Sequence, residues 1–352
     1  MKITFPHMGK LAIPLYSIFS QLGFEVILPP NTCKETIKLG SQYAPEQICL
    51  PFKINLGNLI QAHQLGADTL VMLGGCGPCR FGYYGALLKE ILADMGINYQ
   101  FIYFDENILR TIISFKNNCR LSWLSIYRAV RLGWYKLIIL EELEERIAYI
   151  KPGLQGHKLL ALDRKINDIF AMIHNSASIK EVNEIYNLLP SITKSDETML
   201  KILLVGDIFT ILEPESNQYL ENQLAKNLVI VQKGVTVSHW LKTALIGLER
   251  SAAGTKILRY ARPYLKSPVG GHGLQTIGNS VYHSTRSIHG IIHVMPFNCT
   301  PEIVAGSILP LISNERNVPI LRLAYDEHYS DIGVRTRLEA FIDLIKRKNK
   351  PA

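Results

Sequence analysis

The sequence predicts an α/β protein with two Rossmann-like parallel-sheet halves joined by a helical insertion. Short apolar segments alternate with segments of helical spacing over residues 1–105, and the same alternation returns over residues 198–352. Such alternation is typical of a parallel sheet covered by helices. Residues 106–197 show helical spacing without strand signals. We therefore expect an N-terminal Rossmann-like domain (1–105), a helical insertion or linker (106–197) and a C-terminal Rossmann-like domain (198–352).

In the first half, the apolar patterns predict strands at 3–5, 25–29, 68–73 and 99–104, and helices at 11–22, 51–65 and 83–95. The segment 68–73 (DTLVML) is apolar almost throughout, which is typical of a parallel strand buried on both faces. Gly66 and Gly96 stand where helix C-caps belong.

In the second half, strands are expected at 201–206, 228–232, 290–296 and 319–324, with helices from 238, after 273, from 301 and over 334–347. The segment 290–296 (GIIHVMP) again indicates a buried strand. The middle carries six basic residues and no acidic one between residues 110 and 136. We expect this helical region to close near residues 191–197.

The composition excludes several classes of protein. Hydrophobic residues make up 47% of the 352 residues and charged residues 19%, which excludes disorder and indicates extensive buried surface. No uninterrupted apolar run approaches the roughly 18–20 residues of a membrane span, and the N-terminus lacks the apolar core of a signal peptide. We expect a soluble cytoplasmic protein. The net charge of +8 suggests an anionic partner, but no nucleic-acid motif accompanies it.

Cysteines mark three of the predicted turns that lead into helices. Cys76 and Cys79 follow the strand at 68–73, Cys299 follows the strand at 290–296, and Cys49 directly precedes the helix at 51–65. Ligands of open α/β sheets gather at the carboxyl ends of strands, and helix N-termini favour thiolates. The sequence therefore predicts metal ligation by Cys49, Cys76, Cys79 and Cys299.

The two other cysteines, Cys33 and Cys119, lie outside such turns. A lone cysteine is more often a small buried apolar residue than a ligand. We interpret both as buried thiols.

Glycines in two loops indicate close approach of the backbone to a ligand. Gly74, Gly75 and Gly77 surround the first cysteine pair, where their amides can face a cofactor. A second loop, Val269-Gly270-Gly271-His272-Gly273, precedes a helix but matches neither the dinucleotide fingerprint nor a phosphate-binding P-loop. Gly271, His272 and Gly273 fit either a site for phosphate or thioester groups or a tight turn without a ligand.

Three chemistries compete for the cysteines. Cys76-Gly-Pro-Cys79 matches a thioredoxin-type dithiol, although no aromatic residue precedes the first cysteine. A zinc site needs four ligands, which the four cysteines can supply. An iron–sulfur cluster uses the same thiolates, and its sulfides accept hydrogen bonds from glycine amides. The spacing does not separate zinc from iron.

Several segments resemble the 2-hydroxyacyl-CoA dehydratase superfamily: MKITFPHMG at the N-terminus, CLPFKINLGN from Cys49, GGCGPCRFGYYG from Gly74, VGGHGLQTIG, IIHVMPFNCTPE and TRLEAFIDLI. Within it, the chain is most similar to the acyl-CoA dehydratase activase-related branch, also described as CoA-substrate-specific enzyme activase-like, which is related to double-cubane cluster proteins. The resemblance covers residues 1–105 and 198–348, and the middle is less distinctive.

The resemblance implies an oxygen-sensitive iron–sulfur protein that receives low-potential electrons from a separate actin-like ATPase activator. In dehydratase subunits of the superfamily, three cysteines hold a 4Fe-4S cluster with one iron open to the CoA-thioester substrate, and ketyl-radical chemistry expels the hydroxyl group. Carried onto this chain, the ligands are Cys49, Cys76 or Cys79, and Cys299. The remaining cysteine of the four can close the cluster and make it a pure electron carrier.

The resemblance also raises the question of cluster type. A double-cubane 8Fe-9S cluster needs six terminal thiolates, and the chain has six cysteines. Three ligands from each of two protomers are the alternative, and we expect a homodimer or heterodimer. Because no nucleotide motif is present, the chain is expected to be the electron acceptor. Two rival interpretations stay open: a thiol–disulfide oxidoreductase that uses Cys76 and Cys79, and a scaffold tied together by zinc or a cluster.

Overall fold

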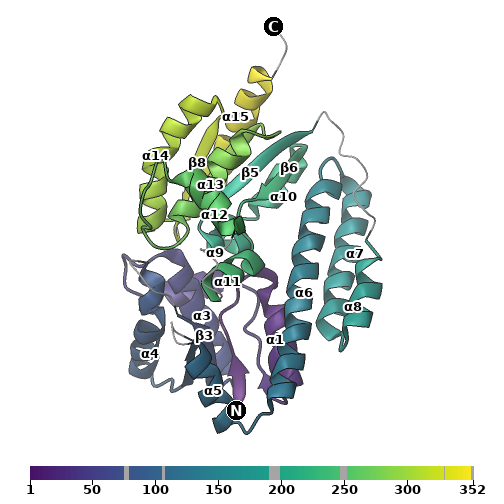
Figure 1. Cartoon of the computed structure of the whole chain (residues 1–352), viewed down its shortest axis with the longest axis vertical. Helices are drawn as coiled ribbons and strands as arrows, with labels where there is room; N and C mark the ends of the chain where they lie inside the picture. The colour runs from purple at the N-terminus through teal and green to yellow at the C-terminus, as the bar shows by residue number, and fades with distance from the viewer. Residues whose placement is uncertain (75–78, 105–107, 190–198, 246–251, 329, 350–352) are drawn as a thin grey trace. The chain divides into compact units, whose positions relative to one another are not determined.

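The computed structural model describes residues 1–74, 79–104, 108–189, 199–245, 252–328 and 330–349 (Figure 1). These residues form an α/β protein with two four-stranded sheets, in which all neighbouring strands are parallel. The chain divides into two compact units, Met1–Leu140 with Phe170–Tyr186 and Glu141–Ile169 with Asn187–Ala352. Each unit contains one sheet, which confirms the predicted pair of Rossmann-like halves.

The first unit contains β1 (Lys2–Thr4), α1 (Ala12–Gln21), β2 (Glu25–Val26), α2 (Lys34–Tyr43), α3 (Leu50–Gln64), β3 (Thr69–Leu73), α4 (Tyr84–Asp94), β4 (Gln100–Phe104), α5 (Ile108–Asn118), the N-terminal part of α6 (Trp123–Ile150), the C-terminal part of α7 (Gly156–Asn175) and α8 (Ile179–Tyr186). Its strands are ordered β2-β1-β3-β4. Short 3-10 helices precede α1 (Gly9–Leu11) and α4 (Arg80–Tyr83).

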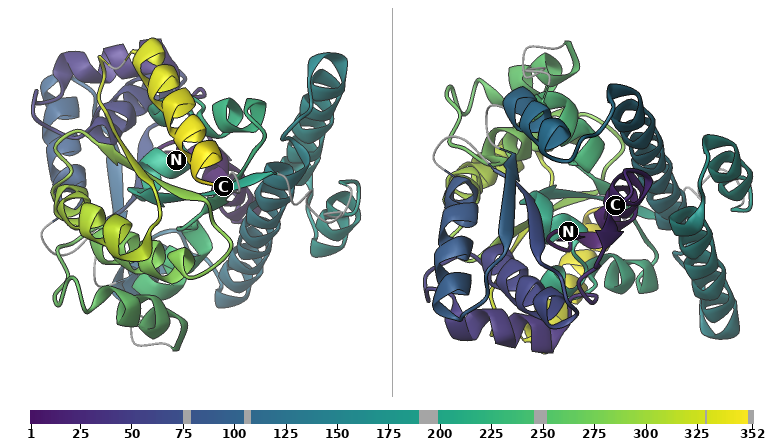
Figure 2. Two further views of the ribbon diagram at one scale, coloured as in Figure 1. Left: turned by 90° about the horizontal axis from the view of Figure 1, so that it is seen from above. Right: turned by 90° about the horizontal axis from the view of Figure 1, so that it is seen from below.

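Both faces of the first sheet are covered, as the apolar run of β3 predicts (Figure 2). Leu70 and Met72 pack in one core cluster with residues of α3 and α4. Val71 points to the other face, where it shares a cluster with Phe19 of α1 and Phe115 of α5. Alternate side chains of one strand thus enter two cores, which is the pattern of a central parallel strand.

Helix α2 packs against α3 through backbone rather than through large side chains. A Cβ atom at Gly40 would lie 1.7 Å from the Lys53 carbonyl oxygen, and one at Gly57 would lie 2.1 Å from the Thr36 carbonyl oxygen. The Thr36 hydroxyl also donates to the Gln61 side chain at 2.9 Å. Glycine is therefore required at both positions.

The second unit contains the rest of α6 and α7, then β5 (Leu200–Gly206), α9 (Ile208–Leu212), α10 (Leu220–Lys226), β6 (Val229–Lys233), α11 (Val237–Leu245), α12 (Ala252–Ala261), α13 (Gly273–Ser284), β7 (Gly290–Pro296), α14 (Thr300–Arg316), β8 (Ile320–Tyr325) and α15 (Asp331–Lys348). Its strands are ordered β6-β5-β7-β8, which repeats the topology of the first sheet. A short 3-10 helix (Glu215–Asn217) precedes α10.

Helices α12, α13 and α14 pack on one another beside the second sheet. Ala261, Ile277 and Leu309, one from each helix, are fully buried in a shared cluster. Helix α15 approaches the start of β7, where a Cβ atom at Gly290 would lie 2.6 Å from Ile345. This layering leaves the carboxyl ends of β5 and β7 beside the N-termini of the helices that follow them.

The described residues between 108 and 189 are helical, as the sequence predicts, and no strand occurs among them. Helix α6 belongs to the first unit up to Leu140 and to the second from Glu141. The expected end of the insertion, at 191–197, lies outside the described residues, and its status as a separate domain stays a prediction. None of the described helices combines the length and apolar character of a membrane span.

Candidate functional site

The carboxyl edge of the first sheet holds the cysteine-rich segments. Strands β1 and β3 are neighbours, and the chain leaves them toward opposite edges of the sheet, which creates the crevice where ligands of such sheets bind. The segment after β1 contains the buried His7. The segment after β3 starts at Gly74 and continues at Cys79. The predicted site residues Gly75, Cys76 and Gly77 lie outside the described residues.

Cys49 is buried at the N-terminus of α3, which packs on this sheet. It is the N-cap residue of α3, with Pro51 in the first turn. Its sulfur lies 2.6 Å from the hydroxyl oxygen of Tyr84, whose side chain is also buried. Helix N-termini and hydroxyl donors both stabilise a thiolate, so this position suits a ligand sulfur.

Cys79 stands at a second helix start close to the Cys49 segment. It is the N-cap residue of the short 3-10 helix that leads directly into α4, and it is partly exposed. The next residue, Arg80, donates to the carbonyl oxygen of Gln47 at 2.6 Å. Together with the contact between Cys49 and Tyr84, this hydrogen bond ties the segment that bears Cys79 to the segment that bears Cys49.

Tyr103 of β4 explains part of the glycine pattern in the cysteine loop. A Cβ atom at Gly74 would lie 2.6 Å from the Tyr103 ring, and one at Gly85 would lie 2.3 Å from it. The Tyr103 hydroxyl donates to the Gly82 carbonyl oxygen at 3.1 Å. These glycines make room for the partly buried Tyr103 ring, so Gly74 has a packing role, and its predicted role toward a cofactor stays a prediction.

The second sheet has the same crevice between β5 and β7. Asp207 follows β5 and is the N-cap of α9, where it accepts hydrogen bonds from the Thr210 amide and hydroxyl, both at 2.9 Å. Cys299 follows β7 and is the N-cap of α14, with Pro301 in the first turn. The topology therefore places the predicted ligand Cys299 at a strand–helix turn, as expected.

The glycine loop before α13 turns His272 inward. Gly270 and Gly271 have positive φ angles of 81° and 48°, which favour glycine. A Cβ atom at Gly273 would lie 2.7 Å from the Pro301 carbonyl oxygen, so glycine lets the N-termini of α13 and α14 meet. His272 is the N-cap of α13 and is only 7% exposed. All three glycines thus have a backbone role, and the structure gives no test of phosphate binding.

A buried polar cluster lies beside His272. Nε2 of His293 lies 2.8 Å from Oε2 of Glu302, and the Thr276 hydroxyl donates to the same oxygen at 2.9 Å. His293 and Glu302 are at most 1% exposed. Glu302 occupies the third position of α14, where a glutamate usually turns back to cap its own helix. Here it points into the protein.

Asp207 and His272 interact electrostatically with each other and with Glu302 of this cluster. Burial raises the pKa of the Asp207 carboxyl group, and the nearby Glu302 raises it further, while the hydrogen bonds from Thr210 and the charge of His272 oppose this. Burial lowers the pKa of His272, against the attraction of Asp207 and Glu302. Both shifts run toward the uncharged form of the group, and an acid and an imidazole shifted in this way are suited to holding and passing a proton.

Three polar atoms of the cluster have no hydrogen-bond partner among the described residues: Nε2 of His272, Nδ1 of His293 and Oε1 of Glu302. Buried polar atoms are nearly always satisfied, so these atoms are available to water or a ligand. The sequence analysis missed Asp207, His293 and Glu302. The polar residue directly after the strand at 201–206 was the available signal for Asp207.

Within the described residues, no three His, Cys, Asp or Glu side chains are close enough together to hold a metal ion. Cys49 and Cys79 belong to the first unit and Cys299 to the second. Cys33 instead caps α2, where its backbone amide and sulfur both contact the Thr36 hydroxyl. The predicted metal ligands therefore stay predictions.

Comparison with family models gave no match to the chain, and no curated protein shows significant sequence similarity to it. The resemblance to the dehydratase superfamily accordingly rests on the sequence motifs.

Proposed function

We propose that this chain is an iron–sulfur protein of the 2-hydroxyacyl-CoA dehydratase type, which receives low-potential electrons from a separate ATP-dependent activator. The observation that carries the proposal is the pair of thiol-bearing helix starts in the first unit. Cys49 and Cys79 are both N-cap residues, and their segments are joined through Tyr84 and Arg80. Thiolates near helix N-termini are the donors that iron–sulfur clusters use.

The donor set fits such a cluster chemically. Cys49, Cys76, Cys79 and Cys299 are the ligands that we propose. When bound, the cluster supplies one-electron transfer at low potential. The Tyr84 hydroxyl lies 2.6 Å from the Cys49 sulfur and would donate to it when the sulfur is a ligating thiolate, which is how neighbouring groups tune a metal site.

Dehydration of a CoA thioester also needs an acid, because a hydroxyl group leaves more easily as water. In the second unit, Asp207 is the carboxyl group that burial keeps inclined toward its protonated form. His272 interacts with it electrostatically, and its neutral imidazole can accept a proton from water and pass a proton on to the Asp207 carboxylate. We assign the acid role to this pair, within the same proposal.

Anaerobic purification followed by analysis of iron, sulfide and zinc tests the proposal. We expect a brown protein with equal amounts of iron and acid-labile sulfide. The single variants Cys49→Ser, Cys76→Ser, Cys79→Ser and Cys299→Ser should each lose most of the iron. Cys33→Ser and Cys119→Ser are the matched controls and should keep it. Iron loss in all six variants would instead indicate a double-cubane cluster.

Two outcomes would contradict the proposal. A colourless protein that contains zinc and no iron would favour the scaffold interpretation. A metal-free protein that reduces insulin disulfides, and loses this activity in Cys76→Ser, would identify a thiol–disulfide oxidoreductase.

A further inference from the structure

Apolar side chains are exposed along two consecutive helices of the first unit, α5 and the first turns of α6. On each helix, positions spaced at i, i+4 and i+7 share one face. Such positions are apolar throughout on α6, and on α5 the third of them is a lysine. Exposed apolar side chains in this number mark an interaction site. Each is between 46% and 74% exposed: Leu109 and Ile113 on α5, and Trp123, Leu124, Tyr127 and Val130 on α6.

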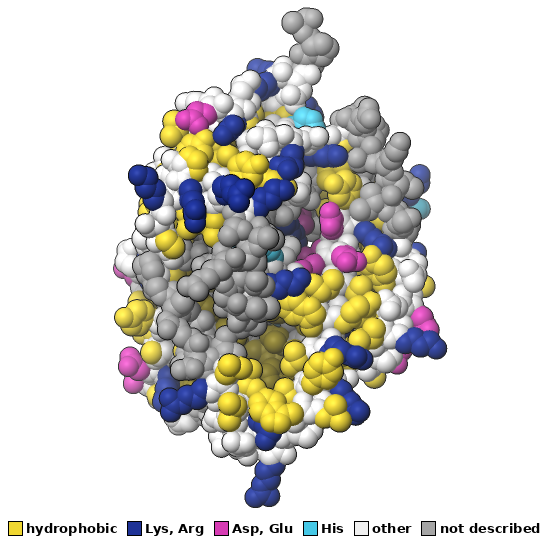
Figure 3. Space-filling model, in the orientation of Figure 1, with side chains coloured by type: hydrophobic (Ala, Val, Ile, Leu, Met, Phe, Trp, Pro, Cys, Tyr) yellow, Lys and Arg dark blue, Asp and Glu magenta, His cyan; other side chains and the backbone are white. Residues whose placement is uncertain are grey.

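Cations stand among these apolar side chains. The Lys116 ammonium of α5 lies 5.5 Å from the centre of the Trp123 ring, which joins the exposed faces of the two helices. Cζ of Arg131 lies 6.0 Å from the centre of the Tyr127 ring. In the lower part of Figure 3, hydrophobic and basic side chains lie next to one another in the region of α5 and the start of α6. The six apolar side chains and four cations, Lys116, Arg120, Arg128 and Arg131, are called the α5–α6 surface below.

The α5–α6 surface has no acidic residue of its own. No Asp or Glu occurs anywhere from residue 107 to residue 140. Among the described residues, none of its four cations forms an ion pair with a carboxylate. Three of the four are arginines, whose forked side chains bind carboxylates through two parallel hydrogen bonds. Charge complementarity therefore requires an acidic partner.

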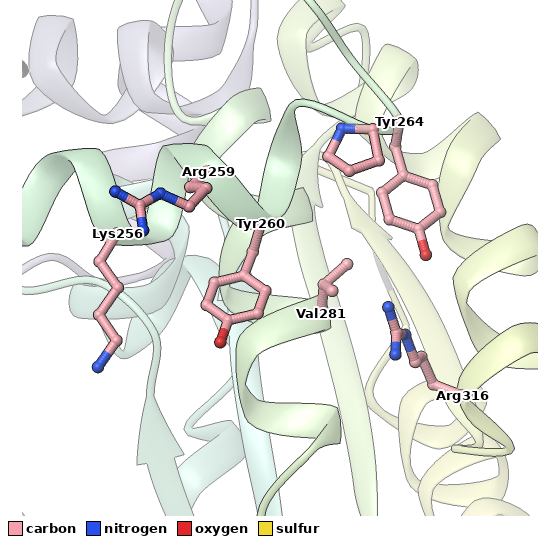
Figure 4. Close-up of a pocket in the computed structure, with 7 residues that line it drawn as sticks. Lys256, Arg259, Tyr260, Tyr264, Val281 and Arg316 are labelled. Atoms are coloured by element: carbon pink, nitrogen blue, oxygen red, sulfur yellow. The ribbon is translucent and has the colours of Figure 1, made fainter.

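The cations beside α12 and α14 in the second unit lack this combination with exposed apolar groups. Figure 4 shows Arg259 and Arg316 at opposite ends of a cavity, with Tyr260 and Val281 between them. The Tyr264 hydroxyl near Arg316 donates to a carboxylate, that of Glu315. These two arginines do not converge on one partner, so they provide a charge-matched control for the α5–α6 surface.

A second copy of this chain is a poor partner for the α5–α6 surface. Two such surfaces that meet on a two-fold axis would bring like charges together. The acidic run of α6, at residues 141–145, is partly bound within its own unit. Glu141 accepts hydrogen bonds from Ser238, and Glu144 pairs with Lys233. Half of the four carboxylates in the run are therefore already in use.

A lipid surface fits less well than a protein, because the charges are not separated from the apolar groups. Helices that lie in a membrane interface carry apolar residues on one face and charged residues on the opposite face. Arg131 follows Tyr127 by four residues and therefore lies on the same face, where it contacts the ring. Insertion of this face into hydrocarbon would bury the charge at high cost. A protein can instead place a carboxylate against it.

We propose that the α5–α6 surface docks an acidic amphipathic helix of another protein. Apolar side chains of that helix pack against Trp123 and Tyr127, and its carboxylates pair with Arg128 and Arg131. Trp, Tyr and Arg are the residue types that dominate the binding energy of protein interfaces. Anchors at i, i+4 and i+7 suit helix-on-helix packing. The inference does not depend on the iron–sulfur proposal, because none of these residues is a proposed ligand or acid.

Fluorescence anisotropy of the full chain with labelled peptides tests the inference. The peptides share one helical sequence of about 20 residues with leucine along one face. Their flanking positions are all Glu, all Gln or all Lys, and a fourth peptide scrambles the Glu sequence so that its leucines no longer share a face. We expect the Glu peptide to bind at least tenfold more tightly than the other three. Because the measurement needs no iron, its outcome is independent of the iron analysis.

Two double variants locate the binding. Arg128→Gln/Arg131→Gln removes charge, and Trp123→Ser/Tyr127→Ser removes the aromatic anchors. Each should weaken binding of the Glu peptide at least tenfold. The matched control, Arg259→Gln/Arg316→Gln, removes the same charge from exposed positions of the second unit and should bind as the wild type does. Circular dichroism checks that each variant is folded.

Several results would overturn the inference. They are absence of binding to the Glu peptide, equal binding of the scrambled peptide, and equal weakening in the control. Binding to vesicles of phosphatidylcholine and phosphatidylserine that Trp123→Ser/Tyr127→Ser abolishes would assign the surface to lipid instead. A dimer in analytical ultracentrifugation that the same variant converts to a monomer would assign it to a second copy of the chain.

Discussion

The sulfur of Cys49 and the hydroxyl oxygen of Tyr84 lie 2.6 Å apart inside the core of the first unit. Cys49 is the N-cap residue of α3 and Tyr84 is the first residue of α4. Their contact therefore joins the N-termini of two helices. The Tyr84 ring is fixed by edge-on contacts with Phe52 and Phe81. The hydroxyl therefore has a defined position relative to the thiol.

Tyr84→Phe removes the hydroxyl and keeps the ring. In the iron-loaded protein, we expect the reduction potential to become more negative, because a hydrogen bond to a ligand sulfur stabilises the reduced cluster. Redox titration followed by EPR measures the shift. Tyr99→Phe is the control, because its hydroxyl donates to the Leu59 carbonyl oxygen, away from the cysteines. Equal potentials in wild type and Tyr84→Phe would contradict Cys49 ligation.

Gly57→Ala tests the close packing of α2 and α3. The new methyl group would lie 2.1 Å from the Thr36 carbonyl oxygen, and backbone cannot move aside as a flexible side chain can. We expect a loss of about 1–3 kcal/mol in the free energy of unfolding, which outweighs the roughly 1 kcal/mol that alanine contributes to a helix. Gly333→Ala in α15 meets nothing within 4 Å and should stabilise slightly. Urea denaturation compares the two variants, and equal midpoints would refute the packing argument.

The same glycine contact explains an element that the sequence did not reveal. Helix α2 buries only Thr36 and Gly40, so its sequence, KETIKLGSQY, lacks the apolar periodicity by which helices are found. The strands of both sheets were predictable because continuous apolar runs such as 68–73 and 290–296 report local burial. Periodicity detects side chains that enter a core, and backbone-to-backbone packing leaves no such pattern.

The candidate sites were predictable to different degrees. The turns that carry Cys79 and Cys299 followed from local order along the chain, because strand–helix boundaries are local features. Cys49 precedes a helix as expected, but it follows α2 and not a strand. The polar cluster of the second unit did not follow from local order. His293 stands within an apolar strand, and Glu302 resembles a helix-capping residue. Their contact depends on β7 and α14 folding back on one another, which is tertiary information.

Lys136→Met tests a buried lysine of the first unit. Lys136 is fully buried and donates to the carbonyl oxygens of His174 and Ser176. Burial lowers its pKa from 10.5 to about 8, although Glu181 opposes the shift. Between these pH values the unfolded chain binds a proton that the folded chain does not, so wild-type stability gains a contribution as pH rises from 8 to 10.5.

The variant cannot ionise at this position and should lose that rise. Denaturant unfolding at a series of pH values from 7.5 to 10.5 measures the free energy of unfolding of wild type and variant. Lys158→Met, at an exposed position of α7, is the control. Parallel pH profiles for wild type and Lys136→Met would show that the lysine stays charged in the folded protein.

Asp207→Asn tests the proposed acid of the second unit. Asparagine caps helices as aspartate does, so the hydrogen bond from the Thr210 amide is expected to survive.

Burial raises the pKa of Asp207 above 3.8. As pH rises beyond that value, the folded state holds a proton that the unfolded state releases, and the stability of the wild type therefore falls. The variant should escape this fall and gain stability relative to wild type as pH rises above 3.8. Infrared spectroscopy should show a protonated carboxyl band in wild type that is absent from the variant, whereas Asp168→Asn, exposed on α7, should keep both properties of the wild type. A constant stability difference without the band would mean that Asp207 is ionised, and the acid would have to be sought elsewhere.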